Sequence, residues 1–344
     1  MPAGRPPRAA VRAAVRSCLS DLEPGQRVVV ALSGGADSLA LTAATVAVGA
    51  ELGLLCEAVV IDHQLQPRSG EVAARAAEQA RILGCVQAQV IAVDVPRGSG
   101  SGGVEAAARS ARYAALDAVA GAVPPAAAVL LGHTREDQAE TVLLGLARGS
   151  GTRSLAGMAA RSGVYRRPLL DLPREVVAAA ALEAAAADSR LEPWSDPHNT
   201  DAGFTRVRVR HEVLPVLESA LGPGIVEALA RTATQAREDA DALDAWAEQV
   251  WAAVESADTS QPSGAAALPI AALSSAGEPL PPAIVNRVVR RFLVGAGCPT
   301  GSLTAGHTRA VAALLEPGTS ARAEVALPGG RRARREAGAL VVRV

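Results

Sequence analysis

A buried strand that runs into a glycine turn is the feature that most limits how this chain can fold. Residues 27–32, Arg-Val-Val-Val-Ala-Leu, form the continuous apolar run typical of a strand covered on both faces of a parallel sheet. Similar runs occupy 56–62, 87–95 and 127–132, and Ala-rich stretches of helical spacing, such as 69–83 and 104–119, alternate with them. The alternation predicts an α/β domain with a doubly wound, mostly parallel sheet, whose ligands bind at the carboxyl ends of the strands.

This alternation stops near residues 221–224. A long Ala-rich helical pattern follows at 231–254, and a second helix is indicated at 284–293. The apolar runs 323–327 and 339–344 flank Pro328-Gly329-Gly330, which predicts a hairpin. We therefore expect an α/β domain at residues 1–222 and a smaller, mainly helical domain at 223–344 that ends in a β-hairpin.

The composition excludes several chemistries. The 344 residues include no lysine, so all 34 basic side chains are arginine, against 35 Asp and Glu. A Walker-type phosphate loop and a Schiff-base enzyme both need lysine, and neither can occur here. A net charge of −1 gives no general attraction to nucleic acid or membrane, so such a partner must be bound by local arginine clusters.

The four cysteines are far apart in the sequence and form no CxxC pair. A zinc knuckle or an iron–sulfur site is therefore not expected, no metal site is indicated by a side-chain cluster, and a reducing, cytoplasmic location is favoured. Charged residues interrupt every apolar run before the roughly 18 residues that a membrane span needs. The N-terminal segment is rich in arginine and lacks the apolar core of a signal peptide, so no membrane association is expected.

The turn after the first strand has the composition of an anion-binding loop. Two glycines allow the backbone N–H groups to converge, two serines add hydroxyls, and the start of a helix adds its positive end. Asp37 does not suit a plain phosphate site, because its carboxylate repels phosphate unless it binds Mg²⁺ or a cationic substrate. The loop consists of Ser33, Gly34, Gly35, Ala36, Asp37 and Ser38.

Polar residues also follow the second and fourth predicted strands, at the same edge as the loop. Asp62 and His63 end the second strand, and His133 ends the fourth. Asp137 and Glu140 are three residues apart at the start of a helix, hence on one face, where two carboxylates can bind an ammonium group or a metal. Alternatively, acidic residues in a first helical turn simply complement the helix dipole.

The loop resembles that of the N-type ATP pyrophosphatases, the PP-loop superfamily of Rossmann-like enzymes, which reads SGGxDS and binds the pyrophosphate of ATP. Further segments are similar to tRNA(Ile)-lysidine synthetases over about residues 28–218 and again near the end of the chain. They are DHQLQPRS from Asp62, ARSARY from Ala108, GHTREDQAETVLLGLARGSGTRSLAGM from Gly132, RRPLLDLPRE from Arg166, DPHNTDAGFTRVRVRHEVLPVLE from Asp196, and LPGGRRARREAGAL from Leu327. The chain departs from the usual pattern at Gln64, Gln66, Thr134 and Val207.

The resemblance implies a ligase with ATP and Mg²⁺ as cofactors. Members join free L-lysine to the wobble cytidine of the isoleucine tRNA with a CAU anticodon. The cytidine oxygen attacks the α-phosphate of ATP, pyrophosphate leaves, and the side-chain amine of lysine then displaces AMP to give lysidine. A homodimer is a further possibility for the assembly.

The resemblance also assigns roles to the residues at the strand ends. Residues 33–38 with Asp62 and His63 would bind ATP, and Asp37, Asp137 and Glu140 would bind lysine. The expected catalytic residues are Asp37, Arg112, His133 and Asp137. The group that accepts the proton of the lysine amine stays open among Asp137, Glu140 and His133.

Arginine-rich segments are the candidates for tRNA binding, because the planar guanidinium fork suits phosphate. We expect alternate arginines of an extended segment at 206–210 to face one way and the C-terminal hairpin to present a second patch. The predicted contacts are Arg206, Arg208, Arg210, Arg332 and Arg335.

Two other functions remain open at this point. A small-molecule ATP pyrophosphatase, such as an amide-forming synthetase, shares the loop but has no need of an arginine-rich second domain. A non-catalytic RNA-binding protein on the same scaffold would not need the loop and the carboxylates. The glycine/serine run at 98–103 is either a lid over the site or a linker.

Overall fold

The computed structural model describes residues 5–95, 103–149, 151–256, 266–275, 278–316, 318–320 and 322–343. The chain forms two compact units, residues 1–237 and 238–344. Each unit has its own hydrophobic core, and the residues predicted to bind ATP and lysine all lie in the first.

The first unit contains a six-stranded sheet in the order β3-β2-β1-β4-β6-β5, parallel except for the last strand. Val28, Val29 and Val30 of the central strand have no exposed surface, as expected of a strand covered on both faces. The order reverses direction between β1 and β4, since β2 and β3 continue on the other side of β1. The strands are β1 (Arg27–Ala31), β2 (Leu55–Asp62), β3 (Gln87–Ala92), β4 (Ala128–Leu130), β5 (Arg161–Ser162) and β6 (Tyr165–Arg166).

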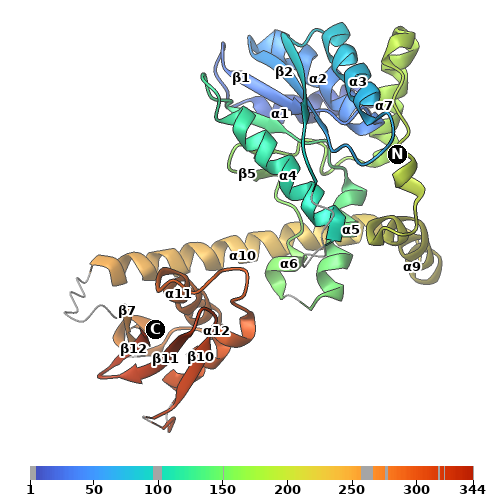
Figure 1. Ribbon diagram of the computed structural model, residues 1–344. Coiled ribbons are helices and arrows are strands. Elements are labelled where there is room, and N and C mark those ends of the chain that lie inside the picture. Colours follow the sequence, from blue (N-terminus) through green and yellow to red (C-terminus); the bar gives the residue numbers. More distant parts are fainter. Residues whose placement is uncertain are drawn as a thin grey trace. The chain divides into compact units, whose positions relative to one another are not determined.

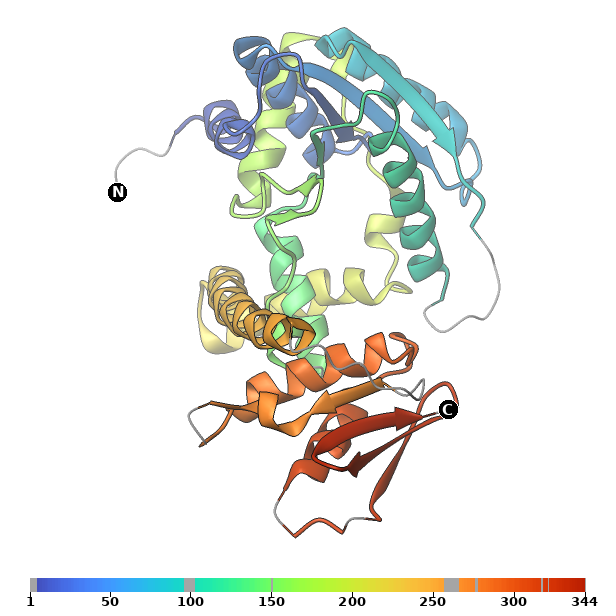
Figure 2. The same ribbon diagram turned by 90° about the vertical axis from the view of Figure 1, so that its left-hand side faces the viewer.

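Helices cover both faces of this sheet (Figure 1; Figure 2). Val28 and Val30 pack under α1 (Pro7–Leu19), α2 (Ala36–Leu52) and α7 (Arg174–Ala187), and α3 (Ser69–Leu83) covers β2 and β3 on the same face. Val29 faces the opposite way, toward α4 (Gly103–Ala120). The remaining helical segments before residue 222 are α5 (Arg135–Ala147), α6 (Thr152–Leu155), η1 (Ser189–Leu191), η2 (Pro197–Thr200), α8 (Thr205–Arg208), η3 (Val209–Val213) and α9 (Leu214–Leu221).

Helix α10 (Ile225–Ser256) crosses the boundary between the two units. Near its start, Ile225 and Leu229 pack against Leu214 in the first unit. Further along, Ala247 and Val254 belong to the core of the second unit. The units therefore divide inside a helix, after Arg237, whereas the expected boundary at 222/223 lies in the loop before it.

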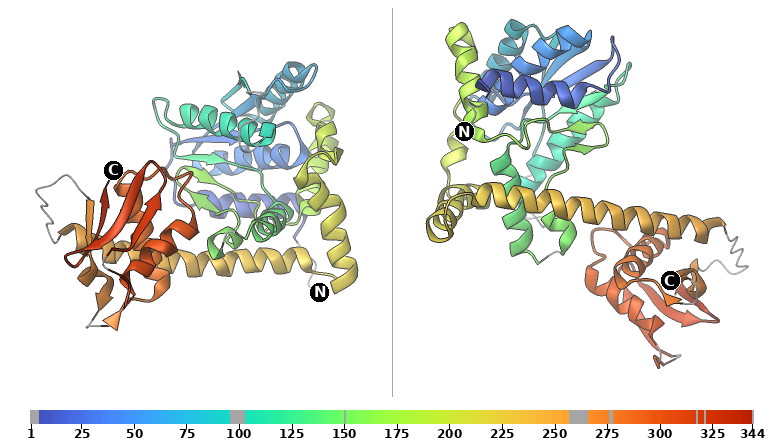
Figure 3. Two further views of the ribbon diagram at one scale, coloured as in Figure 1. Left: turned by 60° about the horizontal axis from the view of Figure 1, so that its bottom comes forward. Right: turned by 180° about the vertical axis from the view of Figure 1, so that it is seen from behind.

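The second unit is built on an antiparallel sheet with the order β10-β11-β12-β7, covered by α11 (Pro282–Gly295) and α12 (Ala305–Ala312) (Figure 3). The two predicted hairpin strands do not pair with each other, because each pairs with β11 (Arg331–Glu336), which lies between them. A second turn at Ala337-Gly338, where both residues have positive φ, returns the chain into β12. The other elements are β7 (Ala266–Pro269), η4 (Ile270–Leu273), β8 (Ser274–Ser275), β9 (Glu278–Pro279), η5 (Ala313–Leu315), β10 (Glu324–Leu327) and β12 (Ala339–Arg343).

Two expectations concern individual segments. The glycine/serine run at 98–103 lies outside the described residues except for its last glycine, so its role as lid or linker stays a prediction. Within the described ranges, no single helix is long and apolar enough to cross a membrane. Residues 205–221 and 225–255 reach the length and the apolar composition of a membrane span only as a pair, and the two helical segments are bent by 100° relative to each other.

Gly145 allows α5, which carries Asp137 and Glu140, to pack closely against α6. An ideal Cβ at Gly145 would lie 2.6 Å from the backbone oxygen of Ser154, so Gly145→Ala requires the backbone to shift. We expect this variant to lower the free energy of unfolding of the first unit by about 1–3 kcal/mol in denaturant titrations. Gly295→Ala is the control, because nothing lies within 4 Å of its Cβ and alanine favours a helix. Equal stability of the two variants would contradict the tight packing.

Candidate active site

The loop between β1 and α2 is shaped by its two serines. Ser38 Oγ accepts a hydrogen bond from the Ser33 backbone N–H at 3.1 Å and donates one to the Gly35 carbonyl at 2.9 Å. Gly34 has a φ of 86°, in the left-handed region that favours glycine. The first turn of α2 follows at once, with no side chain capping its N–H groups. The loop therefore presents backbone donors and a helix N-terminus to an anion.

A cavity of about 290 Å³ opens beside this loop at the carboxyl ends of β1 and β2. Ser33, Asp62, His63 and Arg112 line it together, although they come from three different segments of the chain. Its outer wall includes Trp194, whose backbone N–H donates to the Gly34 carbonyl at 2.9 Å. The structure thus brings the predicted ATP-binding residues of two strand ends and the predicted catalytic arginine to one cavity.

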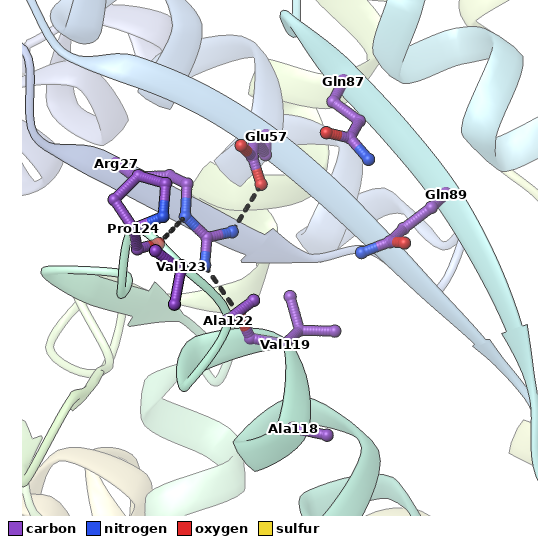
Figure 4. Close-up of a pocket in the computed structure, with 9 residues that line it drawn as sticks. All are labelled: Arg27, Glu57, Gln87, Gln89, Ala118, Val119, Ala122, Val123 and Pro124. Atoms are coloured by element: carbon purple, nitrogen blue, oxygen red, sulfur yellow. Dashed lines mark hydrogen bonds and ion pairs between the residues drawn. The ribbon is translucent and has the colours of Figure 1, made fainter.

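A larger cavity, of about 450 Å³, lies at the amino ends of the same strands (Figure 4). The Arg27 guanidinium there donates to Glu57 at 2.7 Å, to the Val119 carbonyl at 2.7 Å and to the Pro124 carbonyl at 2.9 Å. The guanidinium thus links β2, the end of α4 and the segment at Pro124. The cavity beside the loop is the better candidate, because open α/β sheets bind ligands at their carboxyl edge, where the strand order reverses.

Gln66 closes the side of the smaller cavity. Its side-chain amide donates to Asp196 Oδ1 at 2.9 Å and lies 2.8 Å from His198 Nδ1. Gln66 is one of the positions at which the chain departs from the usual pattern of the family it resembles. Here a neutral amide links the segment after β2 to the segment around residue 196.

Three carboxylates from two helices form an acidic cluster next to the loop: Asp37 at the start of α2, and Asp137 and Glu140 in the first turns of α5. The Glu140 side chain has no exposed surface, while Asp137 is 14% and Asp37 is 28% exposed. Asp137 also caps its own helix, because its Oδ2 accepts the Thr134 backbone N–H at 2.8 Å. The structure therefore brings together all three predicted lysine-binding residues, and one of them also has a structural role.

Arginine side chains surround the acidic cluster. Arg174 lies 2.7 Å from Asp137, 3.6 Å from Asp37 and 3.8 Å from Glu140. Arg210 donates to Glu140 Oε1 at 2.7 Å and lies 3.2 Å from Asp137, and Arg206 lies 3.5 Å from Glu140. The sequence reasoning missed Arg174, although the RRPLLDLPRE segment that contains it was part of the resemblance.

The surroundings shift the acid strength of each carboxyl group. Burial raises the pKa of Asp37 to about 6, and the nearby Arg174 only partly offsets this. Burial also raises the pKa of Glu140, against the opposing effect of Arg210. For Asp137, burial is outweighed by Arg174 and by the Thr134 N–H, so its pKa is lowered.

No group of three or more His, Cys, Asp or Glu side chains suited to a metal occurs within the described ranges.

A buried basic cluster adjoins both the cavity, which Arg112 lines, and the acidic cluster, where His133 acts electrostatically on Asp137. His133 Nδ1, Arg112 Nε and Arg167 Nε are buried and have no hydrogen-bond partner. Burial lowers the pKa of His133 to about 3, with Arg167 and Arg112 lowering it further, so the ring is neutral. Arg167, which the sequence reasoning also missed, donates to the Tyr113 hydroxyl at 3.2 Å. Unpartnered buried nitrogen atoms beside guanidinium groups suit an anionic ligand.

The expected extended arginine segment is instead helical. Arg206, Arg208 and Arg210 lie in α8 and the π-turn η3, so they do not face one way. Arg206 and Arg210 point into the acidic cluster, while Arg208 donates to the Ala202 carbonyl at 2.6 Å. Arg332 pairs with Glu324 at 3.1 Å, and Arg335, three residues further along β11, lies on the opposite face of the sheet. All five arginines stay predicted tRNA contacts.

The raised pKa of Asp37 makes a prediction about stability. Between its usual pKa of 3.8 and about 6, the folded chain holds a proton that the unfolded chain has released, so stability falls as the pH rises through this window. Asp37→Asn removes the buried charge, and we expect it to raise the free energy of unfolding by roughly 1–3 kcal/mol at pH 7 and by little at pH 4.

The control for this prediction has the opposite sign. Asp21 has its pKa lowered to about 2 by its hydrogen bond from Arg166, so its charged form favours folding. Asp21→Asn should therefore lower stability at pH 7. Denaturant titrations at the two pH values measure both effects. A loss of stability for Asp37→Asn at pH 7 would mean that pairing with Arg174 outweighs burial.

Comparison with known proteins identifies the family. A model of the PP-loop domain matches residues 8–217, and one of the TilS substrate binding domain matches residues 268–341. The tRNA(Ile)-lysidine synthase of Thermobifida fusca (strain YX) is 53% identical over 337 residues, which cover 98% of each chain. That of Streptomyces coelicolor is 50% identical and covers 92% of this chain and 85% of its own.

A solved structure shares the fold. The U34-tRNA thiolase of Methanococcus maripaludis with its 4Fe-4S cluster aligns with a TM-score of 0.52 over 66% of this chain and 78% of the thiolase. At 16% identity this likeness concerns the fold alone. The sequence matches extend over both units and nearly the full length of the first relative. The chain therefore belongs to the tRNA(Ile)-lysidine synthase family of ligases.

Proposed function

We propose that this chain joins free L-lysine to the wobble cytidine of the isoleucine tRNA with a CAU anticodon. The products would be lysidine, AMP and pyrophosphate, formed through an adenylated cytidine. The observation that carries the proposal is an anion-binding loop and a buried basic cluster directly beside an acidic cluster, all in the first unit. A phosphate reaction and the binding of a cationic amine both need such groups. The named activity of the curated relatives supports the same reaction.

The phosphate half of the reaction uses the loop and the basic cluster. Residues 33–38 would bind the pyrophosphate portion of ATP through backbone N–H groups and serine hydroxyls. The cytidine oxygen bonds to the α-phosphorus and the bond to pyrophosphate breaks, so charge develops on the α-phosphate oxygens. Arg112 and Arg167, each with an unpartnered buried nitrogen, would stabilise that charge.

Magnesium would accompany the ATP phosphates and offset their charge. Asp37 is the carboxylate on the loop, and it is the residue that would hold the ion there. Since Arg174 lies 3.6 Å from the same carboxylate, Asp37 also belongs to the acidic cluster. The position of Asp37 is therefore compatible with both roles that the sequence leaves open, which are binding of Mg²⁺ and binding of a cationic substrate.

The amine half of the reaction uses the acidic cluster. The side-chain amine of lysine attacks the activated cytidine carbon, and the bond from that carbon to the AMP oxygen breaks. The amine must first lose a proton, because lysine is protonated at neutral pH. His133, with a pKa near 3, is a weak base, which leaves the carboxylates of Asp137 and Glu140 as the candidates to accept the proton.

The decisive assay combines purified protein, ATP-Mg²⁺, labelled lysine and transcripts of the isoleucine tRNA. Label should enter the CAU transcript and depend on ATP, while a transcript with uridine in place of the wobble cytidine should stay unlabelled. Pyrophosphate release that depends on a small molecule but not on tRNA would instead indicate an amide-forming synthetase. tRNA binding without label or pyrophosphate release would indicate a non-catalytic RNA-binding protein.

Two variants should separate the half-reactions. Arg112→Ala removes a charge from the phosphate side, so we expect tRNA-dependent exchange of pyrophosphate with ATP to fall about 100- to 1,000-fold. Asp137→Asn retains an oxygen to cap α5 but loses the charge next to Arg174, so lysine incorporation should be abolished while exchange and tRNA binding persist. Loss of exchange and tRNA binding in Asp137→Asn would mean that its role is to support the fold.

A further inference from the structure

The guanidinium of Arg174 occupies the place that a bound ammonium group would take. Among the basic side chains of the described ranges, it is the one that lies within 4 Å of all three carboxylates of the acidic cluster. An ammonium group that binds between Asp37 and Asp137 must therefore displace it. A guanidinium that leaves two carboxylates needs another anion within reach, because an unpaired, partly buried charge is unfavourable.

The substrate itself contains such an anion. In the proposed reaction the side-chain amine of lysine must be unprotonated to attack, so the α-ammonium is the cation that can stay bound to the carboxylates. The α-carboxylate is attached to the same carbon atom as the α-ammonium. A lysine whose α-ammonium replaces the Arg174 guanidinium therefore brings a carboxylate next to the guanidinium that it displaces.

We propose that Arg174 binds the α-carboxylate of lysine, so that the acidic cluster and this arginine together recognise the zwitterionic head of a free amino acid. The inference rests on the proposed function and specifies how its amino-acid substrate is recognised. Charge balance supports it. The side chains in direct contact are three carboxylates and three guanidinium groups, and a zwitterion adds no net charge to them.

Arg174 is better placed for this exchange than its two neighbours. Arg210 bonds Glu140 through two nitrogens, at 2.7 Å and 3.2 Å, and Glu140 is fully buried, so that pair must persist. Arg206 donates to the Thr141 hydroxyl at 2.8 Å. The Arg174 side chain is 25% exposed, and its backbone is fixed as the first residue of α7, where its N–H donates to Glu136 at 2.8 Å. The side chain can therefore turn without moving the helix.

The test compares lysine with cadaverine, which has both amines but no carboxylate, in the full tRNA-dependent ligation. For the unaltered protein we expect the KM for cadaverine to exceed that for lysine by about 10- to 100-fold, the usual effect of a lost charged hydrogen bond. Arg174→Gln should raise the KM for lysine by a similar factor and not raise that for cadaverine, with little change in kcat. Arg174→Lys should recover part of the preference, because it restores one positive charge.

Two further measurements serve as controls. Arg190→Gln alters an exposed arginine that pairs with Asp188, two residues before it, and should leave both KM values unchanged. Pyrophosphate exchange in Arg174→Gln should persist, which shows that the site is folded. An unchanged lysine-to-cadaverine preference in Arg174→Gln, or an equal rise of both KM values, would overturn the proposal. Failure of the unaltered protein to incorporate lysine would instead overturn the proposed function.

Discussion

Glu140 is a carboxylate with no exposed surface, and its charge depends on the guanidinium of Arg210 at 2.7 Å. Removing one partner of such a buried pair typically costs about 3–5 kcal/mol. The pair therefore restricts the positions of the two helical segments that carry its members. It holds η3 against α5, and Arg174 joins α7 to the same group of carboxylates. Three segments that are distant in the sequence thereby meet at one edge of the sheet, where the site lies.

The topology of the sheet explains why both halves of the site lie there. The loop after β1 carries Asp37, and the segment after β4 carries His133 and Asp137, and the strand order reverses between these two strands. Helices leave in different directions at such a point, which opens a crevice outside the strand ends. The two segments approach closely, since an ideal Cβ at Gly132 would lie 3.3 Å from the Asp37 carbonyl. A phosphate-binding loop and an amine-binding cluster can therefore share one reacting centre.

Local sequence patterns predicted the parts of the fold that local forces decide. The helix expected at 69–83 has those bounds in the structure, and the buried valines of β1 lie in the centre of the parallel sheet. The segment from Arg206 to Arg210 was misread because arginine alternates with valine, the period of a strand. In the folded chain Arg210 pairs with Glu140, which is 70 residues away, and no local pattern contains that contact. Arg174 was missed for the same reason, since its partner Asp137 is 37 residues distant.

The position of bound lysine tests the central claim most directly. A crystal structure of the protein with lysine and a non-hydrolysable ATP analogue gives the distance from the α-nitrogen of lysine to the carboxylates of Asp37 and Asp137. We predict hydrogen-bond distances of about 2.7–3.2 Å, with the pair of Glu140 and Arg210 intact. Lysine bound elsewhere, with the Arg174 guanidinium still between the carboxylates, would contradict the role assigned to the acidic cluster.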